Sequence, residues 1–295
     1  MDKLTIKLQF GRYNWGVEVD IKGFFDNIDH NWMVRMLEER IDDRAFLRLI
    51  KKWLRAGVLD TDGKVLHPGT GTPQGGIVSP VLANVYLHYA LDLWFDGVVK
   101  RDKRGEACLI RYADDFVCAF EDRGDAERFY KALGQRLGRF GLELAAEKTR
   151  VIPFSRHRLA GKTSFDVLGF EFRWGKDRSG KDHLKRRTAR KRLRKSRNNF
   201  TEWCRESRHL KRRVLFKLLN AKLRGYYNYY GVHGNSASLK QFFDFATRTL
   251  WKWLNRRSQR RSDNWTGYKE MMAHFKIQQP RIRGRPPKRL ATSMA

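Results

Sequence analysis

Residues 109–120 read LIRYADDFVCAF, with two apolar runs meeting at the adjacent pair Asp114 and Asp115. Apolar strands on either side of a short polar turn are typical of a β-hairpin. Such a hairpin would place both carboxylates at its tip. An Asp-Asp pair in a turn is more often ordinary turn chemistry than a functional site, so its meaning depends on the rest of the chain.

A third aspartate lies at the end of an earlier predicted strand. Residues 15–21 (WGVEVDI) alternate in polarity until Gly23 breaks the pattern, which puts Asp20 at a strand end. Asp29 is then expected to cap a helix. An acidic strand end and an acidic hairpin tip are what a two-metal phosphoryl-transfer site requires, since two Mg²⁺ ions about 4 Å apart need oxygen ligands from separate elements. Mn²⁺ is the alternative ion.

The remaining pattern predicts further helices and short strands. Ser79, followed by Pro80, is expected to cap a buried helix that contains Val81 and Leu93. Residues 60–76 are expected to form a loop, with Asp62 and Gly63 as a hairpin turn between short strands. Helices are also expected near 43–55, near 125–140 and beyond 180, strands near 149–154 and 167–174, and a disordered tail from 280.

The positive charge of the chain is concentrated in its C-terminal part. Its 62 Lys and Arg against 32 Asp and Glu give a formal net charge of +30. Residues 1–170 hold 27 basic and 24 acidic residues, whereas residues 171–295 hold 35 and 8. This excess predicts nucleic acid as the partner, with an anionic membrane surface as the second choice. The densest basic run is expected to contact phosphate: Lys185, Arg186, Arg187, Arg190, Lys191, Arg192, Arg194, Lys195 and Arg197.

Cysteine usage and hydropathy bear on the compartment. The three cysteines form no close pair of the metal-binding type, and their odd number argues against a disulfide framework. No signal peptide and no apolar run long enough to span a membrane are evident. These features predict a soluble, intracellular protein without a membrane partner.

Several segments together resemble the polymerase motifs of group II intron reverse transcriptases. The order and spacing of the motifs agree with that family over roughly residues 13–280, and Tyr-Ala-Asp-Asp together with Pro-Gln-Gly-Gly is highly specific. The resemblance implies an RNA-directed DNA polymerase that uses Mg²⁺, an intron RNA template, a DNA primer or target and dNTPs, and that assists splicing. The motifs are residues 20–30 (DIKGFFDNIDH), 71–80 (GTPQGGIVSP), 111–116 (RYADDF) and 168–170 (LGF).

The same resemblance assigns roles to individual residues. It makes Asp20 and Asp114 metal ligands, with Asp115 completing the acidic cluster and the carbonyl of Ile21 adding a ligand. Without the motifs, Phe25 would be interpreted as a core residue, Gln74 and Gly75 as part of a plain loop, Lys148 as a surface lysine, and residues 168–170 as a routine turn. Their implied roles are exclusion of a ribose 2′-hydroxyl by Phe25, nucleotide contact by Gln74 and Gly75, action on pyrophosphate by Lys148, and a primer grip formed by Leu168, Gly169 and Phe170.

The implied fold is α+β. We expect a polymerase palm, an antiparallel sheet packed on helices, with partial fingers in residues 1–180. A helical, basic thumb or maturase domain is expected in 181–279, where residues 223–231 (LRGYYNYYG) carry the resemblance, and a basic tail in 280–295. The chain begins 19 residues before Asp20, so most of the fingers region is expected to be missing. No nuclease-type Cys/His cluster follows, so an endonuclease domain is expected to be absent.

Two alternatives remain open on the sequence. The chain could be a catalytically inactive maturase or RNA-binding protein, in which case it would bind RNA without extending a primer. It could also be a reverse transcriptase of a retron, a diversity-generating element or a defence system. The resemblance of the basic C-terminal part to intron proteins argues against that second alternative.

Overall fold

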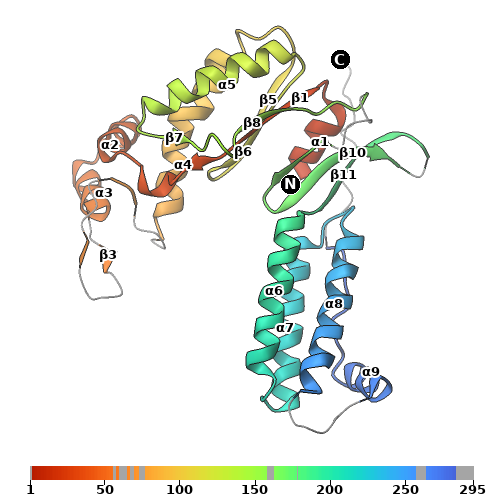
Figure 1. Ribbon diagram of the computed structural model, residues 1–295. Helices are drawn as coiled ribbons and strands as arrows, with labels where there is room; N and C mark the ends of the chain where they lie inside the picture. Colours follow the sequence, from red (N-terminus) through yellow and green to blue (C-terminus); the bar gives the residue numbers. More distant parts are fainter. Residues whose placement is uncertain are drawn as a thin grey trace. The chain divides into compact units, whose positions relative to one another are not determined.

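The computed structural model describes residues 2–55, 58–59, 65–66, 70–72, 77–157, 163–177, 179–256 and 264–283 (Figure 1). It combines helices with antiparallel sheets, which confirms the predicted α+β class. The chain divides into two compact units. The first contains Met1–Val167 and Trp174–His183, and the second contains Leu168–Arg173 and Leu184–Ala295.

A four-stranded antiparallel sheet is the centre of the first unit, with the strand order β5-β6-β1-β8. Alternate residues of the two middle strands, among them Val17, Phe116 and Phe120, enter one hydrophobic core, as the period of a β-strand requires. The predicted hairpin and the predicted strand before Asp20 are therefore confirmed. The strands are β1 (Trp15–Val19), β5 (Ala107–Tyr112), β6 (Asp115–Phe120) and β8 (Arg150–Pro153).

Helices and short strands surround this sheet. The helix α5 packs against β1 and β6, and α2 packs against α3 and α4 (Figure 1). The predicted cap at Asp29 is confirmed, because its carboxylate accepts a hydrogen bond from Trp32 N at 2.9 Å. The bounds are α1 (Asp2–Phe10), β2 (Ile21–Lys22), η1 (Phe24–Asp26), α2 (His30–Glu38), α3 (Arg44–Arg55), β3 (Val58–Leu59), β4 (Val65–Leu66), α4 (Ser79–Leu87), η2 (His88–Asp92), η3 (Phe95–Val99), α5 (Arg123–Gly138), β7 (Glu143–Leu144) and β9 (Ser164–Val167).

Two predictions for the helix after residue 79 are wrong in detail. Ser79 is not the N-cap, because Val78 takes that position and the helix begins at Ser79, with Pro80 tolerated in the first turn. The helix is also buried on one side only, since the exposed fractions of Val81 and Leu93 are 61% and 49%. The α4 segment packs against α2 and the η2 segment against α5, and residues of both segments also line two cavities.

The short strands β3 and β4 form the expected antiparallel pair, with Val58 opposite Leu66. The turn predicted at Asp62 lies outside the described residues.

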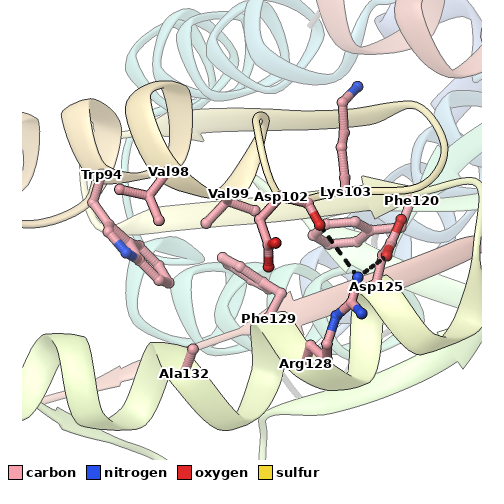
Figure 2. Close-up of a pocket in the computed structure, with 10 residues that line it drawn as sticks. All are labelled: Trp94, Val98, Val99, Asp102, Lys103, Phe120, Asp125, Arg128, Phe129 and Ala132. Atoms are coloured by element: carbon pink, nitrogen blue, oxygen red, sulfur yellow. Dashed lines mark hydrogen bonds and ion pairs between the residues drawn. The ribbon is translucent and has the colours of Figure 1, made fainter.

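An aspartate of α5 organises the segment that leads into β5. Asp125 accepts hydrogen bonds from the backbone N–H groups of Arg104 (2.9 Å) and Gly105 (3.2 Å). It also forms an ion pair with Arg128 at 2.6 Å (Figure 2). Beside it lies a cavity of about 160 Å³, lined largely by apolar residues such as Trp94 and Phe129. None of the residues predicted to form a site lines this cavity, so it belongs to the packing of the unit.

The second unit is mainly a bundle of helices with an apolar core (Figure 1). Buried Leu215, Leu219, Leu223 and Tyr227 of α7 recur at helical spacing, and α6 packs against α8. No helix in the described ranges is both long and apolar enough to cross a membrane. The helices are α6 (Arg190–Ser207), α7 (Arg212–Tyr230), α8 (Ser236–Leu254) and α9 (Trp265–His274).

The onset of helix at residue 180 was wrongly predicted. Residues 182–188 form the strand β11 (Asp182–Thr188), in the sheet order β11-β10-β9 with β10 (Phe170–Lys176). Leu184, Arg186 and Thr188 alternate inward, although two of the three are polar. The strand predicted over 167–174 is divided by a turn at Leu168.

The first residues of the predicted disordered tail pack against the second unit, so disorder from residue 280 was wrongly predicted for residues 280–283. The N–H of Arg283 donates to the carbonyl of Gly231 at 2.7 Å, and Ile282 joins the apolar core of the second unit. Residues 284–295 lie outside the described residues.

Candidate active site

The three predicted aspartates lie at one end of the central sheet because of its strand register. Val19 is paired with Phe116, so Asp20, which directly follows β1, and Asp115, the first residue of β6, lie next to that pair. In the hairpin, Tyr112 is opposite Asp115, and the turn between them consists of Ala113 and Asp114. The backbone therefore brings Asp20, Asp114 and Asp115 to the same end of the sheet from two separate elements.

Lys148 contacts the first of these aspartates. Its Nζ lies 2.8 Å from Oδ2 of Asp20, with exposed side-chain fractions of 63% for the lysine and 39% for the aspartate. The hydrogen bond to Asp20, and then the charge of Asp20, raise the pKa of Lys148. The lysine is presented by a tight segment whose Ala145 N–H donates to the carbonyl of Asp20 at 2.9 Å, and Ile21 beside it pairs with Leu144. The predicted lysine is thus a direct neighbour of a predicted metal ligand.

The donor set at this end of the sheet fits a hard divalent cation. Mg²⁺ is usually held by one or two carboxylates together with water and substrate phosphates. Here the neighbouring strand ends carry the carboxylates of Asp20 and Asp115. In the part of the chain that the structure describes, no cluster of three or more His, Cys, Asp or Glu side chains is close enough to hold an ion by itself. The ammonium of Lys148 on Asp20 indicates that this carboxylate takes a cationic partner.

A large cavity opens beside the acidic turn. Its volume is about 830 Å³, and Phe25, Tyr112 and Ala113 are among the residues that line it. Phe25 is half-buried on the short helical turn η1 and packs edge-on against Phe24, with ring centroids 5.3 Å apart. The structure therefore places the predicted sugar-excluding phenylalanine in the same cavity as the turn that carries Asp114.

The beginning of the Gly-rich motif is fastened to the turn that carries Phe25. The N–H of Thr72 donates to the carbonyl of Phe25 at 2.8 Å, and Gly71 N donates to Ile28 O at 2.8 Å. Gly71 has a φ of +88°, and a Cβ there would lie 2.8 Å from the carbonyl oxygen of Asp26. Only glycine fits this close approach without displacement. The predicted nucleotide contacts Gln74 and Gly75 lie outside the described residues.

The predicted primer-grip residues form a strained turn in the second unit. Leu168 and Gly169 both have positive φ, at 50° and 77°. The hydroxyl of Tyr229 donates to the carbonyl of Leu168 at 3.0 Å, and Phe170 stacks on the Tyr229 ring with centroids 6.1 Å apart. The aromatic end of α7 therefore holds this turn in its conformation.

The predicted phosphate-contacting residues fall into two groups. Arg186, only 5% exposed, donates to the carbonyl of His233 at 2.8 Å, and Arg187 forms two hydrogen bonds with Glu171. Arg197 lies over the Phe245 ring, 5.3 Å from its centroid. These three arginines have partners inside the unit. The exposed members of the run are Lys185, Arg190, Lys191, Arg192, Arg194 and Lys195.

Sequence reasoning gave no role to Arg111, the first residue of the RYADDF motif. Its side chain is 13% exposed and forms an ion pair with Asp92 of η2. The position of Arg111 within the motif was the available signal, but nothing in the sequence singled out Asp92. Tyr229 was likewise noticed only as part of an aromatic run.

Comparison with known proteins identifies two matching families. Residues 3–172 match the family "Reverse transcriptase (RNA-dependent DNA polymerase)", and residues 191–271 match "Group II intron, maturase-specific domain". The group II intron-encoded protein LtrA of Lactococcus lactis subsp. cremoris is 50% identical over 84 residues, which are 28% of this chain and 14% of that protein. Protein YkfC of Escherichia coli K12 is 28% identical over 198 residues, 54% of this chain and 52% of YkfC. The chain thus matches about half or less of these relatives' length.

Among solved structures, a telomerase of Candida tropicalis in complex with a fragment of telomeric RNA is similar, with a TM-score of 0.47 and 11% identity, covering 93% of this chain and 51% of the telomerase.

Proposed function

The chain belongs to the reverse transcriptase (RNA-dependent DNA polymerase) family, and from this premise we propose that it is the RNA-directed DNA polymerase of a group II intron, using two Mg²⁺ ions for nucleotidyl transfer. The observation that carries the proposal is the register of β1 and β6 at one end of the central sheet. It brings Asp20, which follows β1, close to Asp115 at the start of β6, with Asp114 in the turn between β5 and β6. A family match with these carboxylates in place supports catalysis more strongly than either finding alone.

In this proposal, Asp20, Asp114 and Asp115 hold the metal ions, with the carbonyl of Ile21 as an additional ligand. When bound, the ions would lower the pKa of the primer 3′-hydroxyl and neutralise charge on the triphosphate. Lys148 supplies a positive charge beside Asp20 and would act on the leaving pyrophosphate. Its exposed, flexible ammonium can exchange Asp20 for a phosphate oxygen when an ion takes that carboxylate.

The cavity at the acidic turn is the proposed site of the incoming nucleotide. Phe25 lines it and would meet a ribose 2′-hydroxyl, which selects deoxynucleotides. The segment of Gly71 and Thr72 is hydrogen-bonded to the turn of Phe25 and Ile28. Gln74 and Gly75, which lie outside the described residues, are proposed as nucleotide contacts on the family resemblance alone. Mn²⁺ would serve as an alternative ion at these oxygen ligands.

The second unit is the proposed holder of nucleic acid. The exposed basic residues at the end of β11 and the start of α6, including Arg190, Lys191 and Arg194, would neutralise phosphates of the intron RNA or of the template and primer. The turn of Leu168, Gly169 and Phe170 would support the primer. Binding of intron RNA by this unit would also assist splicing, and the protein would work in the bacterial cytoplasm beside the nucleoid.

Primer extension on an RNA template tests the proposal. The wild-type chain should extend a DNA primer with dNTPs and Mg²⁺, and Asp114→Asn should abolish extension while leaving RNA binding intact. Asp42→Asn, at an exposed position near α3, is the control and should retain activity. Extension by Asp114→Asn at the wild-type rate would contradict the assignment.

A second candidate is an RNA-binding maturase without polymerase activity. The match of residues 191–271 to the maturase-specific domain and the basic charge of that part favour it. Salt-sensitive RNA binding by a wild-type chain that extends no primer at any dNTP concentration would support this candidate over the first.

A further inference from the structure

The side chain of Arg111 connects the acidic turn to the helix that runs beside it. Its Nε and Nη2 donate to the two carboxylate oxygens of Asp92, at 2.8 and 2.5 Å. Its Nη1 donates to Oδ1 of Asn84 at 2.9 Å and to the backbone carbonyl of Ala113 at 3.0 Å. One guanidinium therefore joins two side chains of the helix to the turn that carries Asp114.

The contact with Ala113 falls at the strained point of the turn. Ala113 has a φ of +54°, a left-handed conformation that is unfavourable for a residue with a Cβ. Its carbonyl belongs to the peptide that leads into Asp114. A charged hydrogen bond to that carbonyl opposes rotation of the peptide, and it therefore limits the directions in which the Asp114 carboxylate can point.

The helix is shaped to present both partners of Arg111. In a regular α-helix, the separation of eight positions between Asn84 and Asp92 would turn the second side chain about 80° away from the first. The η2 segment is a π-helix, in which Leu93 N donates to His88 O, and this wider turn rotates the chain less per residue. Asn84 and Asp92 consequently face the same cavity and the same guanidinium.

We propose that Arg111, held by Asp92 and Asn84, is the positioning residue that fixes the acidic turn so that Asp114 is aligned for metal binding. The kinetic part of this inference rests on the proposed polymerase function. Lysine could not replace Arg111, because the two parallel bonds to Asp92 and the bond to Ala113 need the planar fork of a guanidinium.

A purely structural role is the competing explanation, and Arg136 provides the matched control. Its guanidinium also makes two backbone contacts with the same helix, to Ala90 O at 2.9 Å and Tyr89 O at 3.0 Å, and lies 4.7 Å from the Phe140 ring centroid. Arg136→Lys should thus weaken packing in the same unit without touching the acidic turn.

The experiment compares Arg111→Lys, Asp92→Asn and Arg136→Lys with the wild-type chain. Mn²⁺ affinity is measured by electron paramagnetic resonance, and single-turnover primer extension gives the rate and the dNTP affinity separately. Arg111→Lys and Asp92→Asn should each bind Mn²⁺ more weakly and slow the chemical step about 100-fold, with dNTP affinity nearly unchanged, because a misplaced ligand costs rate rather than nucleotide binding. Arg136→Lys should keep both Mn²⁺ affinity and rate.

The double variant Arg111→Lys with Asp92→Asn should be no worse than either single variant, since both remove one interaction. If Arg111→Lys does not fold, Asn84→Ala, which leaves the ion pair intact, carries the same test with a smaller expected loss. Equal Mn²⁺ affinity and equal rates in the Arg111 and Arg136 variants would overturn the proposal. A wild-type chain that extends no primer would refute the polymerase function, whereas the Mn²⁺ comparison would still decide the role of Arg111.

Discussion

At the scale of single residues, the ion pair between Lys148 and Asp20 offers a way to observe the acidic site directly. Because the hydrogen bond from Lys148 to Asp20 is the main cause of the raised lysine pKa, Asp20→Asn should lower that pKa. The ammonium of the wild-type chain should stay charged below the ordinary lysine pKa, and the ion pair should be lost as pH rises through the raised value. A side-chain NMR titration of Lys148 measures this shift.

The matched control for that titration is Glu143→Gln, which removes the partner of Lys22 on the neighbouring strand and should leave Lys148 unchanged. Adding Mg²⁺ to the wild-type chain should act like Asp20→Asn, since the ion competes for the same carboxylate. A Lys148 pKa that is insensitive to both changes would argue that the pair contributes nothing at the site.

A buried tyrosine makes the second prediction at this scale. The hydroxyl of Tyr86, with no exposed surface, donates to the carbonyl of Phe140 at 2.6 Å. Tyr86→Phe leaves that buried carbonyl without its donor, which should cost about 1–3 kcal/mol of unfolding free energy in urea titration. Tyr112→Phe is the control, because Tyr112 is 69% exposed. The unfolding free energy of this variant should hardly differ from that of the wild-type chain. Equal losses in both variants would contradict the role of the hydrogen bond.

The sequence predicted the aspartates of the candidate site, but it did not reveal the hydrogen bond that joins Arg111 to the turn of Asp114. Asp20, Asp114 and Asp115 follow strand patterns that can be recognised locally, and the motifs gave them a role. The partner of Arg111 lies 19 residues earlier, and its orientation depends on a π-helical turn within an otherwise apolar helix. Local patterns carry no signal for such a turn, since it changes the rotation of the chain and not its composition.

At the scale of elements, the fastening of residues 70–72 to the Phe25 turn can be tested at Gly71. A Cβ at this position would meet Asp26 O at 2.8 Å and Phe25 O at 2.9 Å, and φ is already +88°. Gly71→Ala should therefore cost about 1–3 kcal/mol of stability. It should also weaken dNTP affinity, because the Phe25 turn lines the proposed nucleotide cavity. Thermal unfolding and dNTP-dependent extension measure the two effects.

Gly138→Ala is the control for that variant. Gly138 ends α5, and a Cβ there would meet nothing within 4 Å. Alanine at this helical position should be neutral or stabilise the chain by up to about 1 kcal/mol. If Gly71→Ala were as harmless as Gly138→Ala, the close approach to the Phe25 turn would not matter.

Elements with alternating or helical apolar patterns were predictable, whereas β11 was not. The hairpin of β5 and β6 and the cap at Asp29 follow from local chemistry. In β11 the inward positions include Arg186 and Thr188. The Arg186 side chain donates to His233 O, and the Thr188 hydroxyl accepts from Asn235 Nδ2, both far along the chain. A strand whose buried side is polar has no alternation of hydropathy, so only the tertiary hydrogen bonds define it.

At the scale of the whole molecule, composition predicted a near-neutral part followed by a basic part, but it did not predict where the chain passes from one unit to the other. The excess of Lys and Arg after residue 170 falls largely in the second unit, where α6 and α7 carry it. The strand β10 begins in the second unit and ends in the first, and the chain returns within β11. A break in charge cannot reveal such a crossing, because both strands contain basic residues.

The concentration of charge gives the last prediction, for binding of an RNA template annealed to a DNA primer. Each phosphate-contacting cation releases a counterion, so neutralising three exposed residues of α6, as Lys191→Gln, Arg194→Gln and Lys195→Gln together, should reduce the slope of log affinity against log salt by about 3. The control replaces three exposed cations of the first unit, Arg123, Lys131 and Arg139, with Gln. Both triple variants lose the same net charge. If α6 contacts phosphate directly, only the α6 variant should lower the slope by the full amount; equal slopes in the two variants would mean that net charge alone attracts the nucleic acid.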